Sequence, residues 1–183
     1  MSPPMSRPDE EREPQRAALL DAIAARVGFT PNIASLIAEH PDILALLAPA
    51  FCIKDETLPL MIEGSLGIAI AQEHASGYCL AMHVYLATHV AKLSSDEIAL
   101  NQNGQSDDAR TDPLVRFAIR TMRANGHVTA DDLALLRSAK LSQPDILFLL
   151  LAIFRGVATT FLANLLAPPL DFPAYPLAIP ALD

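Results

Sequence analysis

Several residue types are scarce in this sequence. Tryptophan is absent, aromatic residues make up 5% of the 183 residues, and hydrophobic residues make up 51%. The core must therefore consist mainly of leucine, alanine and isoleucine, and the length suits one domain or two small helical lobes sharing a core. Only two cysteines are present, Cys52 and Cys79. They are too few for a disulfide framework and favour reduced thiols in a cytoplasmic protein.

Positive charge is scarce as well, with 13 Lys and Arg residues against 21 Asp and Glu residues and a formal net charge of −8 at pH 7. A protein that binds nucleic acid needs a basic face to neutralise phosphates. The sequence therefore predicts no nucleic-acid partner, and the charge also disfavours binding to anionic membrane surfaces. The N-terminal segment lacks the apolar core of a signal peptide, and residues 1–13 are predicted to be a disordered lead-in.

One long apolar run covers residues 146–167 and is long enough to cross a membrane. Arg155 and Asn164 interrupt it, and short polar residues dilute its second half. A helix that is apolar nearly all round is also typical of a protein core or a subunit interface. We therefore predict a buried helix of a soluble protein and no membrane segment.

Helical periodicity runs through nearly every segment, and no segment alternates convincingly at period two. The sequence predicts an all-α protein of about eight helices, with one domain over residues 14–175 and an extended, proline-rich tail over residues 176–183. Helices are predicted over residues 14–27, 58–73 and 76–92, among others, and residues 101–112 are predicted to form a polar loop. Helix boundaries are predicted at Gly28, at Ser94 or Ser95, at Asn125-Gly126, and at Thr129 with Asp132 as a capping box.

The segment HASGYCLAMH, residues 74–83, carries the most chemistry. At about 100° per residue, Ser76, Cys79 and His83 fall within one narrow arc of a helix. Cys79 is expected in the first turn, where free backbone N–H groups and the helix dipole favour a thiolate. A histidine one turn later is suited to pair with that thiolate or to take its proton.

Simpler interpretations of this segment remain. A single buried cysteine is most often an inert small hydrophobe. Metal binding is disfavoured because Cys79 and His83 supply two ligands, whereas zinc normally takes three or four protein ligands. We predict no metal and no cofactor.

Four stretches of the chain resemble a known family. GFTPN (residues 28–32) with the break at residues 40–41, IAIAQEHASGYCLAMH (68–83), LSSDEI (93–98) and LDFP (170–173) resemble the peroxidase-related branch of the AhpD-like alkylhydroperoxidase and carboxymuconolactone decarboxylase superfamily. The resemblance implies an AhpD-like all-α fold with an antiparallel core pair of helices. It also implies a homo-oligomer, as a dimer, trimer or hexamer.

The resemblance assigns roles within the core pair. Peroxidases of the AhpD type use a CxxC pair served by a glutamate and a histidine. Cys79 matches the second cysteine, which attacks the peroxide, and His83 matches the histidine. Ser76 stands where the first cysteine would resolve the sulfenic acid as a disulfide, a step that a hydroxyl does not perform.

The glutamate of the family is harder to place. Its spacing falls on Gly64, so Glu63 is one residue away, a rotation of roughly a quarter turn. Glu73, in the turn just ahead of the helix, is the other candidate. Both stay open at this stage.

Three functions compete. The first is a one-cysteine peroxidase in which Cys79 reduces a hydroperoxide and an outside thiol reductant, or Cys52, resolves the sulfenic acid. The second is a non-redox enzyme in which His83 with Glu63 or Glu73 acts as acid and base on a small lactone or keto acid. The third is an inactive member that keeps the fold.

Overall fold

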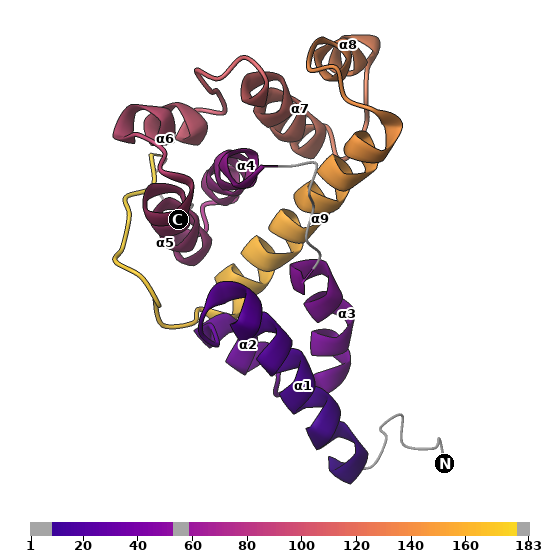
Figure 1. Ribbon diagram of the computed structural model, residues 1–183, viewed down its shortest axis with the longest axis vertical. Helices are drawn as coiled ribbons and strands as arrows, with labels where there is room; N and C mark the ends of the chain where they lie inside the picture. Colours follow the sequence, from indigo (N-terminus) through magenta and orange to yellow (C-terminus); the bar gives the residue numbers. More distant parts are fainter. Residues whose placement is uncertain (1–8, 53–58, 179–183) are drawn as a thin grey trace. The chain divides into compact units, whose positions relative to one another are not determined.

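The computed structural model describes residues 9–52 and 59–178, and every element in these ranges is helical (Figure 1). No strand occurs in the described ranges, so the predicted all-α class is confirmed. Contacts divide the chain into two compact units, residues 1–54 and 55–183. The single domain over residues 14–175 stays a prediction.

The first unit consists of α1 (Asp9–Val27), α2 (Asn32–Ile37) and α3 (Pro41–Cys52), with α1 packed on α3 and α2 in contact with both. α1 ends before Gly28, whose φ of +95° is the left-handed conformation expected of a helix stop. Its start takes in residues 9–13, part of the predicted disordered lead-in, because acidic residue types favour a helix N-terminus. Residues 1–8 lie outside the described part.

The second unit is built around α4 (Leu60–Glu73). This helix packs against α5 (Gly77–Leu86), α6 (Ser95–Gln102), α7 (Thr111–Arg123) and α9 (Gln143–Leu166), while α8 (Ala130–Ser138) packs on α7. Figure 1 shows α4 with these helices around it. Every residue from Gly64 to Gln72 is buried, which explains why α4 is apolar on all sides.

The hydrophobic core of this unit joins α4 to α7, α8 and α9. A cluster of apolar side chains fills the space between the four helices, and Phe117 is the largest side chain buried in it. Its members are Ile62, Leu66, Ala69, Ile70, Leu114, Val115, Phe117, Ala118, Ile119, Leu136, Leu149 and Ile153. Aliphatic residues dominate this core, as the scarcity of aromatic residues predicts.

α4 and α5 form the predicted antiparallel pair. A Cβ at Gly64 would lie 3.5 Å from the Cβ of Ala87, and a Cβ at Gly67 would meet the ring of His83, so the register runs in opposite directions. The predicted helix over residues 76–92 is interrupted, because α5 passes into a π-helical turn, Ala87–Ala91, that ends at Lys92 with φ of +60°. Single π-turns of this kind occur frequently at functional sites.

Most helix ends lie at the capping and left-handed residues that the sequence predicted. Ser94 caps α6 by accepting a hydrogen bond from the backbone N–H of Glu97, and Thr129 forms a capping box with Asp132 at the start of α8. Asn125 and Gly126 follow α7 with φ of +52° and +85°. The polar loop is shorter than predicted and covers residues 103–110, because α6 extends to Gln102 and α7 begins at Thr111.

α9 has one buried and one exposed apolar face. Leu149, Ile153, Thr159, Thr160 and Ala163 are buried, whereas Leu147, Leu150, Phe154, Phe161 and Leu165 are exposed. The prediction of a buried helix is therefore correct for one face only. By length and composition alone, α9 is the one helix in the described ranges that is long and apolar enough to cross a membrane.

Candidate functional site

The chain turns sharply between α4 and α5. Ala75 has φ of +50°, and Ser76 is in an extended conformation directly before α5 begins at Gly77. Cys79 therefore lies in the first turn, as predicted, and is 1% exposed. Ser76 is fully buried, but its hydroxyl makes no capping hydrogen bond and has no hydrogen-bond partner of ordinary geometry.

The surroundings of Cys79 favour the neutral thiol, whereas the sequence predicted a thiolate. Burial raises the pKa of the Cys79 thiol above its usual range, and the neighbouring Ser76 hydroxyl opposes that rise only in part. Removing the thiolate from water outweighs the helix dipole, whose effect is modest. Cys79 is therefore a neutral thiol at pH 7.

The imidazole ring of His83 packs directly against the backbone of α4 at Gly67. A Cβ at Gly67 would lie 2.2 Å from His83 Nδ1, so only glycine leaves room for the ring. Burial, followed by the charge of Arg155, lowers the pKa of His83 to about 4. His83 is therefore neutral at pH 7 and a weaker base than a free imidazole, and it lies one turn after Cys79 on α5.

Glu63 lies one turn before Gly67 on α4 and forms an ion pair with Arg155 on α9. Arg155 Nη2 is 3.4 Å from Glu63 Oε1, and the two side chains are 23% and 18% exposed. Arg155 also lies close enough to His83 for its charge to affect the ring. The structure thus gathers Glu63, Arg155 and His83 from three helices.

Glu73 is placed at the other end of α4. Ten residues of helix separate it from Glu63, about 15 Å along the axis. Its two carboxylate oxygens accept hydrogen bonds of 2.7 and 2.8 Å from Arg123 on α7. Of the two candidate glutamates, Glu63 is the one that pairs with Arg155, whose charge reaches His83.

The other histidines of this region are engaged elsewhere. His89 lies on the π-turn, where Nδ1 is 2.8 Å from the carbonyl oxygen of Tyr85. His74 packs edge-on against Phe161. Among the residues with described side chains, no three His, Cys, Asp or Glu side chains come close enough together to hold a metal ion. The side chain of Cys52, the alternative resolving thiol, lies outside the described part.

A non-helical segment, residues 168–178, which we call the strap, follows α9 and runs along the outer face of α5. Tyr78 donates a hydrogen bond to Asp171, and the ring of Tyr85 stacks on Phe172 with centroids 4.5 Å apart. Further along, Gln72 Oε1 accepts a hydrogen bond of 3.0 Å from the backbone N–H of Ala178. Residues 176–178 of the predicted extended tail are non-helical, and residues 179–183 lie outside the described part.

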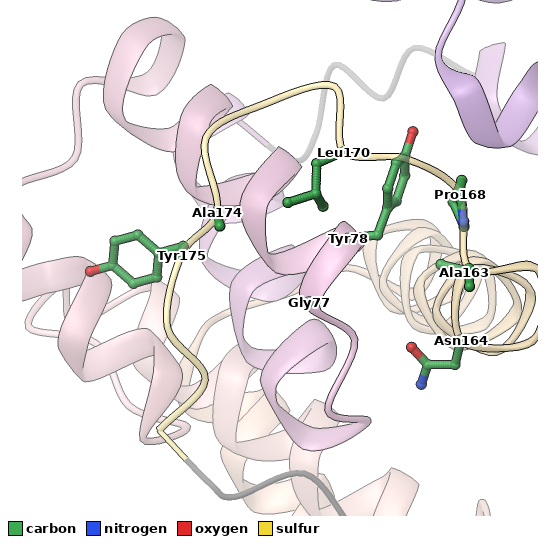
Figure 2. A pocket seen from close by; sticks show the side chains of 9 residues that line it. Gly77, Tyr78, Ala163, Asn164, Pro168, Leu170, Ala174 and Tyr175 are labelled. Atoms are coloured by element: carbon green, nitrogen blue, oxygen red, sulfur yellow. The ribbon is translucent and has the colours of Figure 1, made fainter.

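A shallow pocket of about 350 Å³ opens between the strap, the start of α5 and the end of α9 (Figure 2). Most of its lining groups are apolar, and Tyr78, Asn164 and Tyr175 supply polar atoms. The pocket is lined by Gly77, Tyr78, Ala163, Asn164, Ala167, Pro168, Leu170, Ala174 and Tyr175. Neither Cys79 nor His83 is part of this lining.

Sequence reasoning missed two residues of the site, Gly67 and Arg155. Gly67 gave no signal, because its role depends on which ring packs against it. Arg155 gave one: it is the only charged residue between positions 146 and 166. A lone charge in an apolar helix needs a partner, and that partner is Glu63.

Comparisons with known proteins identify the fold. No protein-family model matches the sequence, and no curated protein matches it. Among solved structures, an uncharacterised peroxidase-related protein with an alkylhydroperoxidase AhpD core, from Ralstonia eutropha JMP134, is similar with a TM-score of 0.70 and 21% identity over 84% of this chain and 83% of that chain. A cysteine-to-alanine variant of the debrominase Bmp8, in complex with 2,3,4-tribromopyrrole, is similar with a TM-score of 0.63 and 15% identity over 93% of each chain. The chain has the AhpD-like all-α fold.

Proposed function

We propose that the protein is an AhpD-like, peroxidase-related enzyme that reduces hydroperoxides through the single thiol of Cys79. One observation carries this proposal: Cys79 and a neutral His83 lie one turn apart on α5, with the His83 ring fixed against Gly67. A neutral imidazole is a proton acceptor, which a buried thiol needs before it acts as a nucleophile. As further expectations, we propose a homo-oligomer and a cytoplasmic location.

The reaction takes two stages. His83 accepts the proton of the Cys79 thiol, and the sulfur attacks one oxygen of the hydroperoxide. The O–O bond breaks, the leaving alkoxide takes the proton from His83 to give an alcohol, and Cys79 becomes a sulfenic acid. Ser76 has no sulfur with which to resolve it. An outside thiol therefore condenses with the sulfenic acid, releasing water, and a second thiol frees Cys79 as the outside disulfide forms.

Substitution of Cys79 with serine is expected to reduce thiol-dependent hydroperoxide consumption to the background rate. His83→Gln, which removes the proton acceptor, is expected to slow it by about a hundredfold. The measurement is peroxide loss with a dithiol reductant, combined with trapping of the sulfenic acid by a dimedone probe. His89→Gln serves as the control because His89 is exposed and contacts Tyr85. Equal rates for wild type and Cys79→Ser would refute the proposal.

Alkylation of Cys79 is expected to be slow at pH 7 and to keep rising with pH through the ordinary titration range of a thiol. The raised pKa of the thiol keeps the reactive thiolate fraction small across this range. The measurement is the iodoacetamide labelling rate of Cys79 in a Cys52→Ser variant, from pH 6 to pH 10. A plateau below pH 8 would contradict the expectation. Slow labelling also fits an inactive protein, so peroxide turnover decides between these two.

A second candidate function is non-redox acid–base chemistry on a small lactone or keto acid. The observation in its favour is that Glu63 and a neutral His83 both lie beside Arg155, which gives the site a carboxylate, an imidazole and a cation. This function does not require the sulfur of Cys79. A thermal-shift screen of small acids and lactones, with 2,3,4-tribromopyrrole added, tests it. Stabilisation that persists in Cys79→Ser and is lost in His83→Gln favours it over the peroxidase.

A further inference from the structure

The shallow pocket at the start of α5 has a largely apolar lining. It is formed within the second unit by the first turn of α5, the end of α9 and the strap (Figure 2). Leu170 on the strap is 46% exposed, so a large part of an apolar side chain faces water at this place. An apolar ligand that covers it gains from the hydrophobic effect. Five of the nine lining residues are aliphatic residues or proline: Ala163, Ala167, Pro168, Leu170 and Ala174.

The charge around the pocket restricts the ligand that it accepts. None of the nine lining residues is charged. A charged molecule would therefore lose part of its hydration there without gaining a counter-ion. Anions are disfavoured further, because Asp171 accepts the hydrogen bond of the Tyr78 hydroxyl beside the pocket and the chain carries a formal net charge of −8. The surroundings favour a neutral molecule.

Asn164 supplies a polar group with a defined orientation. Its Nδ2 donates a hydrogen bond of 2.9 Å to the carbonyl oxygen of His74, which holds the amide at the edge of the pocket. The amide oxygen of Asn164 is then the atom offered to a ligand, and it accepts a hydrogen bond. A neutral molecule that carries one hydroxyl or N–H group matches this acceptor.

Gly77 keeps the α5 side of the pocket open. A Cβ at this position would meet no atom within 4 Å, so the helix presents bare backbone to empty space there. The pocket volume of about 350 Å³ lies at the low end of the range for sites that bind organic molecules. Its size suits a ligand with a single ring.

We propose that this pocket is a binding site for a small neutral molecule with a one-ring apolar body and one hydroxyl or N–H group. Such a ligand touches α5, α9 and the strap together, and it therefore holds the strap against the start of α5. The inference goes beyond the proposed function. It uses neither Cys79 nor His83, and it stands whether or not the protein reduces hydroperoxides.

The first test uses 4-methylphenol as the probe and full-length protein labelled with ¹⁵N. A saturable change is expected in the amide resonances of Gly77, of the Asn164 side chain and of the strap, with a Kd on the order of 1 mM. The charged compounds 4-methylbenzoate and 4-methylbenzylammonium have a similar size and are expected to bind at least tenfold more weakly. No saturable change at these residues, or equal binding of all three compounds, would overturn the proposal.

Substitutions in two walls locate the ligand. Gly77→Leu narrows the pocket from α5 and Ala174→Leu narrows it from the strap, so each is expected to weaken binding of 4-methylphenol at least tenfold. Two separate walls keep the test valid if one variant fails to fold. Ala130→Leu is the matched control, because Ala130 is the exposed first residue of α8 and lies outside the pocket lining. Unchanged affinity in the pocket variants, or equal loss in Ala130→Leu, would contradict the assignment.

Hydrogen exchange tests whether the ligand holds the strap. At a 4-methylphenol concentration ten times Kd, the amides of residues 171–178 are expected to exchange about tenfold more slowly in wild type, because detachment of the strap then requires release of the ligand. In Gly77→Leu the same concentration should have little effect. Exchange in wild type that does not respond to the ligand would refute the proposed role in holding the strap.

Discussion

Replacement of Gly67 with alanine is expected to displace the His83 ring from its position against α4 and to lower the free energy of unfolding by about 3 kcal/mol. The added Cβ would lie 2.2, 2.4 and 2.5 Å from three atoms of the imidazole, distances at which no two such atoms coexist. The ring must turn away from α4 to accommodate the added methyl group. Urea unfolding measures the loss of stability, and the His83 ring resonances report the displacement.

The same substitution one turn earlier provides the control. A Cβ at Gly64 would meet the Cβ of Ala87 at 3.5 Å, which is ordinary van der Waals contact. Because alanine is a better helix former than glycine, Gly64→Ala is expected to leave stability unchanged or raise it by up to about 1 kcal/mol. If Gly67→Ala proved as stable as Gly64→Ala, His83 would not be seated as described.

Acidification from pH 6.5 to pH 4 is expected to remove up to about 3 kcal/mol of stability through His83 alone. The pKa of His83 is lowered from its ordinary value of 6.5 to about 4 in the folded protein, mainly by burial and then by Arg155. Between these two pH values the unfolded chain binds a proton that the folded chain does not. Unfolding is therefore favoured as the pH falls through this window. Above pH 6.5 the ring is neutral in both states, and His83 causes no such loss of stability.

Comparison with His83→Gln isolates this effect, because glutamine does not titrate. The free energy of unfolding is measured in urea at pH 7 and pH 4.5 for wild type, His83→Gln and the exposed control His127→Gln. Wild type and His127→Gln should lose similar stability on acidification, and His83→Gln should lose markedly less. Equal losses in all three proteins would show that His83 is not the group responsible.

The helix ends were predictable because their causes are local. Ser94 and the Thr129–Asp132 box each use a side chain within three residues of the backbone group that it satisfies. The start of α5 was predicted as well, although Ser76 before it makes no capping hydrogen bond. The resemblance to the AhpD-like family gave the fold, which the similar solved structures confirm.

The parts of the site that escaped prediction depend on residues far apart in the sequence. Arg155 and Glu63 are 92 positions apart, and nothing near either residue indicates the other. The charge state of Cys79 was predicted wrongly for a related reason. The dipole of its own helix was visible in the sequence, whereas its burial depends on the helices that pack around it.

Which of Glu63 and Glu73 belongs to the site likewise depends on the ion-pair partner of each residue, which the sequence does not show. Glu73 directly precedes the segment of residues 74–83 in the sequence, yet it forms an ion pair with Arg123. Glu63 is more distant in sequence, but it lies one turn from Gly67, against which the His83 ring packs, and it pairs with Arg155. The family spacing falls on Gly64, where a side chain would have faced Ala87 instead.

The strap over α5 has a consequence for the order of folding. The hydrogen bond from Tyr78 to Asp171 closes a loop of 93 residues, and the hydrogen bond from Ala178 to Gln72 closes one of 106. The entropy lost on closing loops of this length delays such contacts until the helices between them have assembled. We therefore expect the strap to dock late in folding and to detach first in unfolding. Backbone amides of residues 171–178 should then exchange hydrogen faster than those of α4.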